Sequence, residues 1–270
     1  MSKFNKLITG TAHLLRKPYL INLILEDQEV NRQKVVNKYG FENGLPRIEL
    51  SSLTNKDEFF VEPYTFLEGG SLPTDYILLS VLAEKFSDCV YFEIGTWRGE
   101  SAVNVSRYAN EVYTLNLSED QMREKKWNEN YIRLHGFFSR QLDKITHLAG
   151  DAMSFDFSPW KNKCDVVFID GDHHYESVKT DTENCFSLRR NEKSVLVWHD
   201  YGLSTETARW EVLRGILDGL PPEEHRHLYA VNNTLCAVYY PYPVESFYAD
   251  FPQTPKHDFR VSIQLKKIKA

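Results

Sequence analysis

Short apolar runs alternate with longer amphipathic stretches through the middle of the chain. Each run has the length and composition of a strand that is buried on both faces, as in a parallel sheet. The runs predict five strands, at 90–94, 112–116, 145–149, 165–170 and 195–198. Apolar positions at helical spacing predict helices at 74–86, 100–108, 176–188 and about 206–218. This alternation predicts a mostly parallel sheet with right-handed crossovers.

Three further stretches complete the predicted elements. Two β-rich runs, 227–231 and 235–240, flank an Asn-Asn-Thr turn at 232–234 and predict an antiparallel hairpin. The polar stretch 119–142 has helix-like spacing but no clear boundaries, and 20–36 can form a helix with one apolar side.

The same pattern divides the chain into three parts. We predict an N-terminal extension (1–73) that packs on or covers the core, a core domain (74–240) and a C-terminal tail (241–270). Thr74 is the expected N-cap of the first core helix, and Asp75 lies in its first turn. For the tail, two roles stay open: it crosses the surface, or it contacts a second copy in a homo-oligomer.

Charge and cysteine usage exclude some function classes. The net charge is −6 and the pI is about 5.9, so the basic footprint of a nucleic-acid-binding protein is missing. The four cysteines are scattered without a Cys-x-x-Cys pair, which predicts buried free thiols rather than a zinc site. This usage favours a reducing, cytoplasmic location.

The N-terminal segment contains the only stretch that invites comparison with a membrane signal. Its apolar run, 19–25, is much shorter than the roughly 20 residues that a span requires. Basic residues precede the run, but acidic residues follow it in place of a cleavage site, so we interpret this stretch as a short amphipathic helix. We predict no membrane span.

A glycine turn follows the first core strand. Gly95 ends the strand, and Gly99 precedes an apolar pattern that begins a helix. Two glycines let the backbone approach a ligand at a helix N-terminus, where N–H groups are unpaired. Trp97 stands where a dinucleotide-binding fingerprint needs a glycine, and no Lys-Ser or Lys-Thr follows as in a phosphate-binding P-loop. On this motif alone, a buried strand–helix corner that binds no ligand remains an alternative interpretation.

Polar residues follow every predicted parallel strand. Ligands of open α/β sheets bind beyond the carboxyl ends of the strands, so five such ends predict one shared site. Asn116 stands at the end of the second strand, where a carboxylate would bind ribose hydroxyls more strongly. Asp151 follows the third strand, and a turn-forming role is an equal alternative for it.

The motif Glu-x-Gly-x-x-x-Gly-x-Ser at 93–101 resembles motif I of class I S-adenosylmethionine (SAM) methyltransferases. The resemblance implies a Rossmann-like, seven-stranded, mostly parallel α/β sheet with a terminal antiparallel hairpin. In that family the glycine turn takes the amino-acid end of SAM, and an acidic residue in the place of Asp151 often contacts the adenine. The implied SAM-binding residues are Glu93, Gly95, Thr96, Gly99, Ser101, Asn116, Asp151 and Asp170.

Ile-Asp-Gly-Asp-His-His-Tyr-Glu at 169–176 and Val-Trp-His-Asp-Tyr at 197–201 resemble a narrower group. It comprises metal-using O-methyltransferases of the macrocin and mycinamicin type and cephalosporin hydroxylase-like proteins. The resemblance implies a divalent cation such as Mg²⁺ held by Asp170, His199 and Asp200. His199 replaces an acidic residue of that group, and imidazole suits Zn, Fe, Ni or Mn better than Mg. A capping or packing role for His199 stays open.

His173 follows Asp170 by three residues, where that group has the general base for an acceptor hydroxyl. A neutral imidazole can take such a proton near pH 7. His174 is the competing candidate, and a structural role for both is the third alternative.

These observations together predict a SAM-dependent O-methyltransferase that acts on a small hydroxyl-bearing acceptor, either a sugar or a secondary metabolite. Two alternatives remain. One is an NAD(P)-dependent oxidoreductase on a similar sheet, which Trp97 disfavours, and the other is a non-catalytic SAM-fold binding protein, which the Asp170, His173 and Asp200 constellation disfavours.

Overall fold

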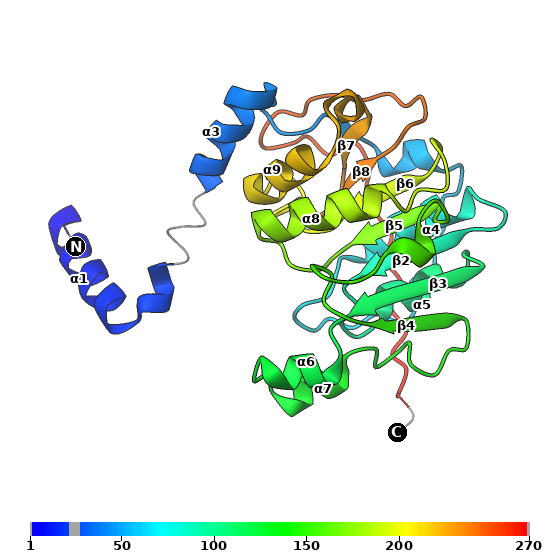
Figure 1. The fold of residues 1–270 in the computed structure, drawn as a ribbon. Helices are drawn as coiled ribbons and strands as arrows, with labels where there is room; N and C mark the ends of the chain where they lie inside the picture. The colour runs from blue at the N-terminus through cyan, green and yellow to red at the C-terminus, as the bar shows by residue number, and fades with distance from the viewer. Residues whose placement is uncertain (1, 22–27, 269–270) are drawn as a thin grey trace.

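The computed structural model describes residues 2–21 and 28–268, which include a single eight-stranded sheet (Figure 1). Its spatial order is β1-β7-β8-β6-β5-β2-β3-β4. All neighbours are parallel except β8, which runs antiparallel to both β6 and β7. The predicted Rossmann-like α/β sheet with a terminal hairpin is thus confirmed. The strands are β1 (Arg47–Ile48), β2 (Val90–Ile94), β3 (Glu111–Asn116), β4 (Ile145–Ala149), β5 (Val166–Ile169), β6 (Val195–Trp198), β7 (Leu228–Val231) and β8 (Ala237–Tyr239).

Helices cover both faces of this sheet. The α-helices are α1 (Lys3–Arg16), α3 (Gln28–Tyr39), α4 (Pro73–Glu84), α5 (Glu100–Val105), α6 (Glu119–Glu124), α7 (Glu129–Leu134), α8 (Tyr175–Phe186) and α9 (Trp210–Gly219). The 3₁₀ turns are Pro18–Ile21, Leu50–Leu53, Ser158–Trp160 and Pro222–His227. No helix of the described ranges is long and apolar enough to cross a bilayer.

The core consists of two apolar clusters, one on each face of the sheet. Val167 and Ile169 of β5 pack with α3, α8 and α9 on one face, whereas Val166 and Phe168 pack with α4 and α5 on the other. Successive side chains of a strand point to opposite faces, so a strand covered on both sides needs an unbroken apolar run. This is the physical reason for the runs in the sequence. All four cysteines are buried and free, as predicted.

The eighth strand, β1, was not predicted. Its two residues lie parallel to β7, and the Arg47 side chain donates to the carbonyl oxygens of Thr205 and Glu206 and to Asn232 Oδ1. These partners are more than 150 residues away along the chain. Long-range contacts rather than local propensity therefore form this strand, and the extension supplies a strand to the core sheet.

Several element boundaries differ from the predictions. Helix α4 is capped at Leu72 rather than Thr74, because the carboxylate of Asp75 accepts the Leu72 N–H at 2.6 Å. Helix α9 begins at Trp210, four residues late, and ends in Gly219 with Leu220 as its C-cap. The predicted helix 100–108 ends at Val105, and the stretch 119–142 contains the short helices α6 and α7.

Two expectations at the N-terminus fall partly on residues 22–27, which lie outside the described residues. Of the predicted helix 20–36, the described part from residue 28 onward is helical in α3. Of the apolar run 19–25, residues 19–21 belong to a 3₁₀ turn, and the 14-residue helix α1 precedes it.

Residues 62–68 of the extension lie against the start of α5. Glu100 Oε1 accepts hydrogen bonds from the N–H and hydroxyl of Thr65 at 2.8 and 2.7 Å, and Arg98 donates to the carbonyl oxygen of Glu68 at 3.1 Å. The Asn104 amide bonds the backbone of Glu62 and Pro63. The extension is therefore attached beside the glycine turn.

Candidate functional site

The glycine turn is held by a close backbone contact. Gly95 has φ +97°, and a Cβ built there would lie 1.9 Å from the carbonyl oxygen of Asp170. A Cβ on Gly99 would lie 2.1 Å from Ser139 Oγ. Both positions therefore need glycine for the fold itself, whatever the turn binds. Larger residues at either position would disturb folding, so they cannot serve as clean tests of ligand binding.

A buried polar network lies beneath the turn. The Glu93 carboxylate is fully buried and accepts hydrogen bonds from Tyr91 at 2.8 Å and from Thr114 at 2.7 Å. Thr96 contacts the Thr114 hydroxyl at 2.5 Å, and because Thr114 donates to Glu93, Thr96 must donate to Thr114. Burial raises the pKa of Glu93 to about 7, although the hydrogen bonds that it accepts, including one from Ser101, oppose the rise.

Asn116 and Asp151 lie at adjacent strand ends beyond this network. The backbone oxygen of Asn116 accepts the Gly150 N–H at 2.8 Å, which brings the ends of β3 and β4 together. Asp151 Oδ1 accepts the Met153 N–H at 3.0 Å, a turn-stabilising contact. Both side chains are partly exposed. The turn role for Asp151 is thus present, and it leaves the second carboxylate oxygen available to a ligand.

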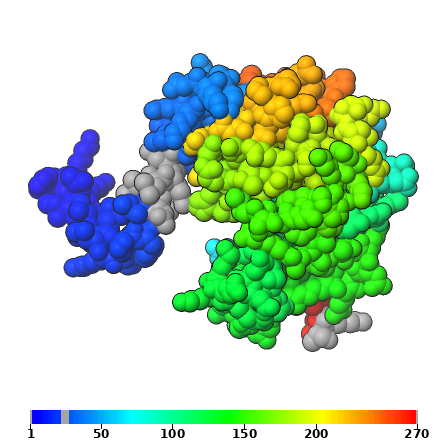
Figure 2. All heavy atoms as spheres, in the orientation of Figure 1, coloured from blue at the N-terminus to red at the C-terminus, as the bar shows by residue number. Residues whose placement is uncertain are grey.

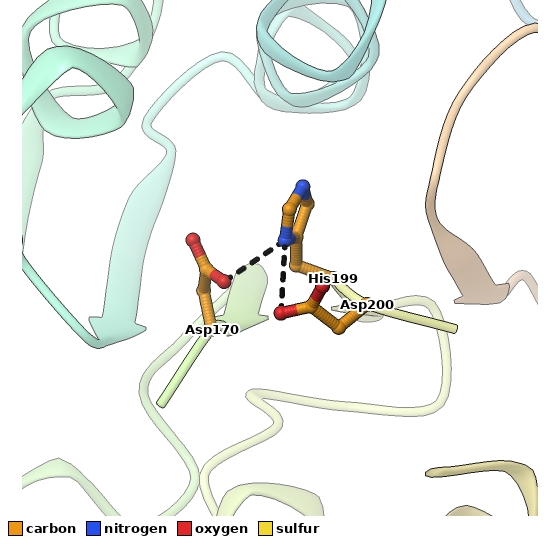
Figure 3. Close-up of side chains that lie close together, drawn as sticks. All are labelled: Asp170, His199 and Asp200. Atoms are coloured by element: carbon orange, nitrogen blue, oxygen red, sulfur yellow. Dashed lines mark ion pairs between the residues drawn. The ribbon is translucent and has the colours of Figure 1, made fainter. Parts of the chain in front are cut away.

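Asp170, His199 and Asp200 come together at the ends of β5 and β6 (Figure 3). His199 Nδ1 lies 3.0 Å from Asp170 Oδ1 and 3.4 Å from Asp200 Oδ2, and one ligand atom from each residue falls within 4.8 Å of the others. Asp200 adopts φ +58°, a left-handed backbone conformation that costs free energy in a residue other than glycine. A small cavity of about 10 Å³ opens among these residues.

The nitrogen at the centre of this cluster lacks a well-aligned hydrogen bond. His199 Nδ1 is buried between the two carboxylates at ion-pair distance, and neither contact has the alignment of a regular hydrogen bond. Buried polar atoms are rarely left this way unless a water or ion completes them. An imidazole with two carboxylates is a donor set for divalent Mn, Fe or Zn more than for Mg. These residues therefore fit the predicted cation.

Asp75 is the member of this site that sequence analysis missed. Its Oδ2 lies 3.2 Å from His199 Nε2, while Oδ1 accepts the Leu235 N–H at 2.9 Å. The carboxylate is fully buried. A histidine that binds a metal through one nitrogen usually donates the other N–H to a carboxylate, which fixes its tautomer and orientation. The sequence identified Asp75 only as a first-turn helix residue, because its partner is 124 residues away.

Opposing effects set the charges of the cluster. Burial lowers the pKa of His199, but the surrounding carboxylates of Asp170, Asp200 and Asp75 outweigh it, so the pKa stands well above its ordinary value. Burial raises the pKa of Asp170 against the attraction of His199. Burial also raises the pKa of Asp200, but His199 and Arg209 outweigh it and bring the pKa below its ordinary value. Without a cation, a protonated His199 thus balances the carboxylates.

The two neighbouring histidines have different surroundings. His173 lines the small cavity with Asp170, His199 and Asp200, and no hydrogen bond or ion pair joins its ring to any described residue. The His174 imidazole contacts the Asp172 carboxylate. The rings stack with their centres 5.1 Å apart. This arrangement leaves the nitrogens of His173 available to a ligand next to the cluster.

Comparison with known families supports the enzyme class. Residues 92–201 match the sequence profile of a family described as a methyltransferase domain. This segment contains the glycine turn, the strand ends and the Asp170, His199 and Asp200 cluster. Over these residues the chain is therefore similar to a methyltransferase domain, in agreement with the predicted enzyme class. A search of the curated proteins found no match.

Solved structures with a similar fold include three methyltransferases. An O-methyltransferase from Bacillus cereus in complex with SAH is 16% identical, with 83% of this chain and 95% of that chain covered and a TM-score of 0.41. SAH-bound PaMTH1 from Podospora anserina is 14% identical, with 63% and 80% covered and a TM-score of 0.40. A putative methyltransferase from Bacillus halodurans is 14% identical, with 46% and 50% covered and a TM-score of 0.37. This chain spans about half the length of the first structures that it matches, and these low scores assign no activity.

The raised pKa of Glu93 predicts a pH dependence of stability. Between about pH 4.5 and 7 the folded protein holds a proton on Glu93 that the unfolded chain releases, so stability falls as pH rises through this window. At 1.36 kcal/mol per pKa unit, the full loss is ~3 kcal/mol. Glu93→Gln removes this titration. In urea denaturation, the free energy of unfolding of the variant should therefore rise relative to that of wild type as the pH increases through this window. Glu58→Gln, which alters an exposed carboxylate, is the control, and an identical pH profile in both variants would refute the prediction.

Proposed function

We propose that this protein is a SAM-dependent O-methyltransferase that acts on a small hydroxyl-bearing acceptor, a sugar or a secondary metabolite, with assistance from a divalent cation. The observation that carries the proposal is the Asp170, His199 and Asp200 cluster, which lies beside the glycine turn within the segment that matches a methyltransferase domain. His173 lines the same cavity.

The SAM site in this proposal lies between the glycine turn and the ends of β3 and β4. Thr96 lies in the turn itself, whereas Gly99 and Ser101 stand at the start of α5, whose first backbone N–H groups can receive the carboxylate of SAM. Asn116 receives the ribose and Asp151 the adenine amino group. Glu93 acts from beneath the turn, where it bonds Thr114 and fixes the end of β2.

The reaction needs a nucleophilic oxygen, a base and alignment with the methyl group. The carbon–sulfur bond of SAM breaks as a carbon–oxygen bond to the acceptor forms, the hydroxyl proton passes to His173, and S-adenosylhomocysteine (SAH) leaves. Asp170 belongs to the proposed SAM site and to the cluster, so it aligns the two substrates.

Asp170, His199 and Asp200 would hold the cation, and Asp75 would orient His199 through Nε2. A bound divalent cation supplies Lewis acidity, which makes a nearby hydroxyl easier to deprotonate. The imidazole ligand favours Mn²⁺, Fe²⁺ or Zn²⁺ over Mg²⁺. The rival oxidoreductase function requires NAD(P)H at the same turn, so a binding comparison separates the two.

We expect SAH, the product of the proposed reaction, to bind the wild-type protein in calorimetry, and NADH not to bind. Asp151→Ala should weaken SAH binding roughly tenfold or more, because a charged hydrogen-bond acceptor is lost. Asp156→Ala is the matched control, since Asp156 forms the same kind of turn contact at 3.0 Å, with the Ser158 N–H. Binding of NADH without SAH would establish the oxidoreductase alternative.

We expect Mn²⁺, titrated into the purified protein, to bind at the cluster. Asp170→Asn and Asp200→Asn should each reduce the affinity, and Asp75→Asn should reduce it about 10–100-fold by releasing His199. Asp172→Asn changes an exposed carboxylate two residues from Asp170 and should leave the affinity intact. Unchanged Mn²⁺ affinity in folded Asp170→Asn would place the cation elsewhere or exclude it.

His173→Ala should lower kcat by about 10²–10⁴-fold with little change in SAH affinity, because the acceptor proton loses its base. Screening hydroxylated small molecules with radiolabelled SAM supplies the acceptor for this measurement. His174→Ala is the matched control, because its ring is engaged by Asp172. A large loss in His174→Ala alone would transfer the role to His174.

A further inference from the structure

Helix α1 carries its apolar side chains on one face. Phe4, Leu7, Ile8 and Leu15 follow the spacing of a single helical face and are 68, 67, 54 and 79% exposed. No residue of α1 is buried, and the helix stands apart from the sheet and its covering helices (Figures 1 and 2). An apolar face this exposed marks a surface for interaction.

The other side of α1 is basic. Lys6 and His13 lie opposite the apolar face, Lys3 and Arg16 lie at its flanks, and Lys17 follows directly. Residues 2–21 contain no Asp or Glu, although the whole chain has a net charge of −6. The segment is therefore opposite in charge to the rest of the protein.

We propose that α1 binds the protein to the surface of an anionic lipid bilayer. A helix with one apolar face and a cationic polar face lies in the membrane interface, with its apolar side about 5–10 Å deep and its cations among the headgroups. At 14 residues, α1 would extend about 21 Å along the surface. Tyr19, which is 64% exposed just beyond the helix, suits the headgroup region.

The charge pattern favours a membrane over a second copy of the chain. Two α1 helices packed through their apolar faces would bring only cations near one another, because the segment supplies no carboxylate to pair with them. Anionic lipid supplies both an apolar layer and the opposite charge, and each Lys or Arg near it adds attraction. This inference is independent of the proposed methyl transfer.

Flotation of the full-length protein with phospholipid vesicles tests the inference. Binding is expected to phosphatidylcholine vesicles that contain about one third phosphatidylserine, and it should weaken with added salt and be much lower on pure phosphatidylcholine. Leu7→Gln/Ile8→Gln should lose most binding. Asn5→Gln/Thr9→Gln places two glutamines on the polar face as the matched control and should bind like wild type.

Removing charge is the second arm. Lys3→Gln/Lys6→Gln should weaken binding to the anionic vesicles roughly tenfold or more. Equal binding to both kinds of vesicle, or equal loss in the apolar-face variant and its control, would overturn the proposal. Sedimentation without lipid completes the test: a dimer that Leu7→Gln/Ile8→Gln dissociates would identify a second copy as the occupant and overturn the membrane assignment.

Discussion

The whole candidate site depends on the close approach of two strand ends. Gly95, the residue after β2, comes so near the carbonyl oxygen of Asp170 that no side chain fits between them. The contact places the loop after β5 beside the glycine turn, and β6 then carries His199 and Asp200 to the same edge. Parallel register alone would bring the strand ends near one another, whereas this contact leaves no room for a side chain between the glycine turn and Asp170.

His199 divides the site into an inner and an outer half. Its Nε2 faces the fully buried Asp75, and its Nδ1 faces Asp170 and Asp200 at the partly open edge. The inner half has its hydrogen bonds satisfied, whereas in the outer half the nitrogen contacts two carboxylates without a well-aligned hydrogen bond. A cation site requires this asymmetry. One nitrogen of the histidine is held by a rigid second residue, and the other nitrogen can bind the metal.

The central sheet could be predicted because β2, β5 and β6 are covered on both faces, which forces unbroken apolar runs into the sequence. The place of the site followed from the rule that ligands bind at the carboxyl ends of strands. Strand β1 and the role of Asp75 could not be predicted, because both depend on contacts over more than 100 residues of chain. Local patterns encode the burial of a residue but not the identity of a distant partner.

Asp75 also connects elements that are far apart in the sequence. One carboxylate caps α4 through Leu72, anchors the turn of the β7–β8 hairpin through Leu235 and supports His199. The β7–β8 hairpin, whose strand β8 pairs with β6, is thereby also connected to His199 through a side chain. Any movement of that turn, whether thermal or caused by a molecule bound there, would therefore change the orientation of the His199 imidazole ring.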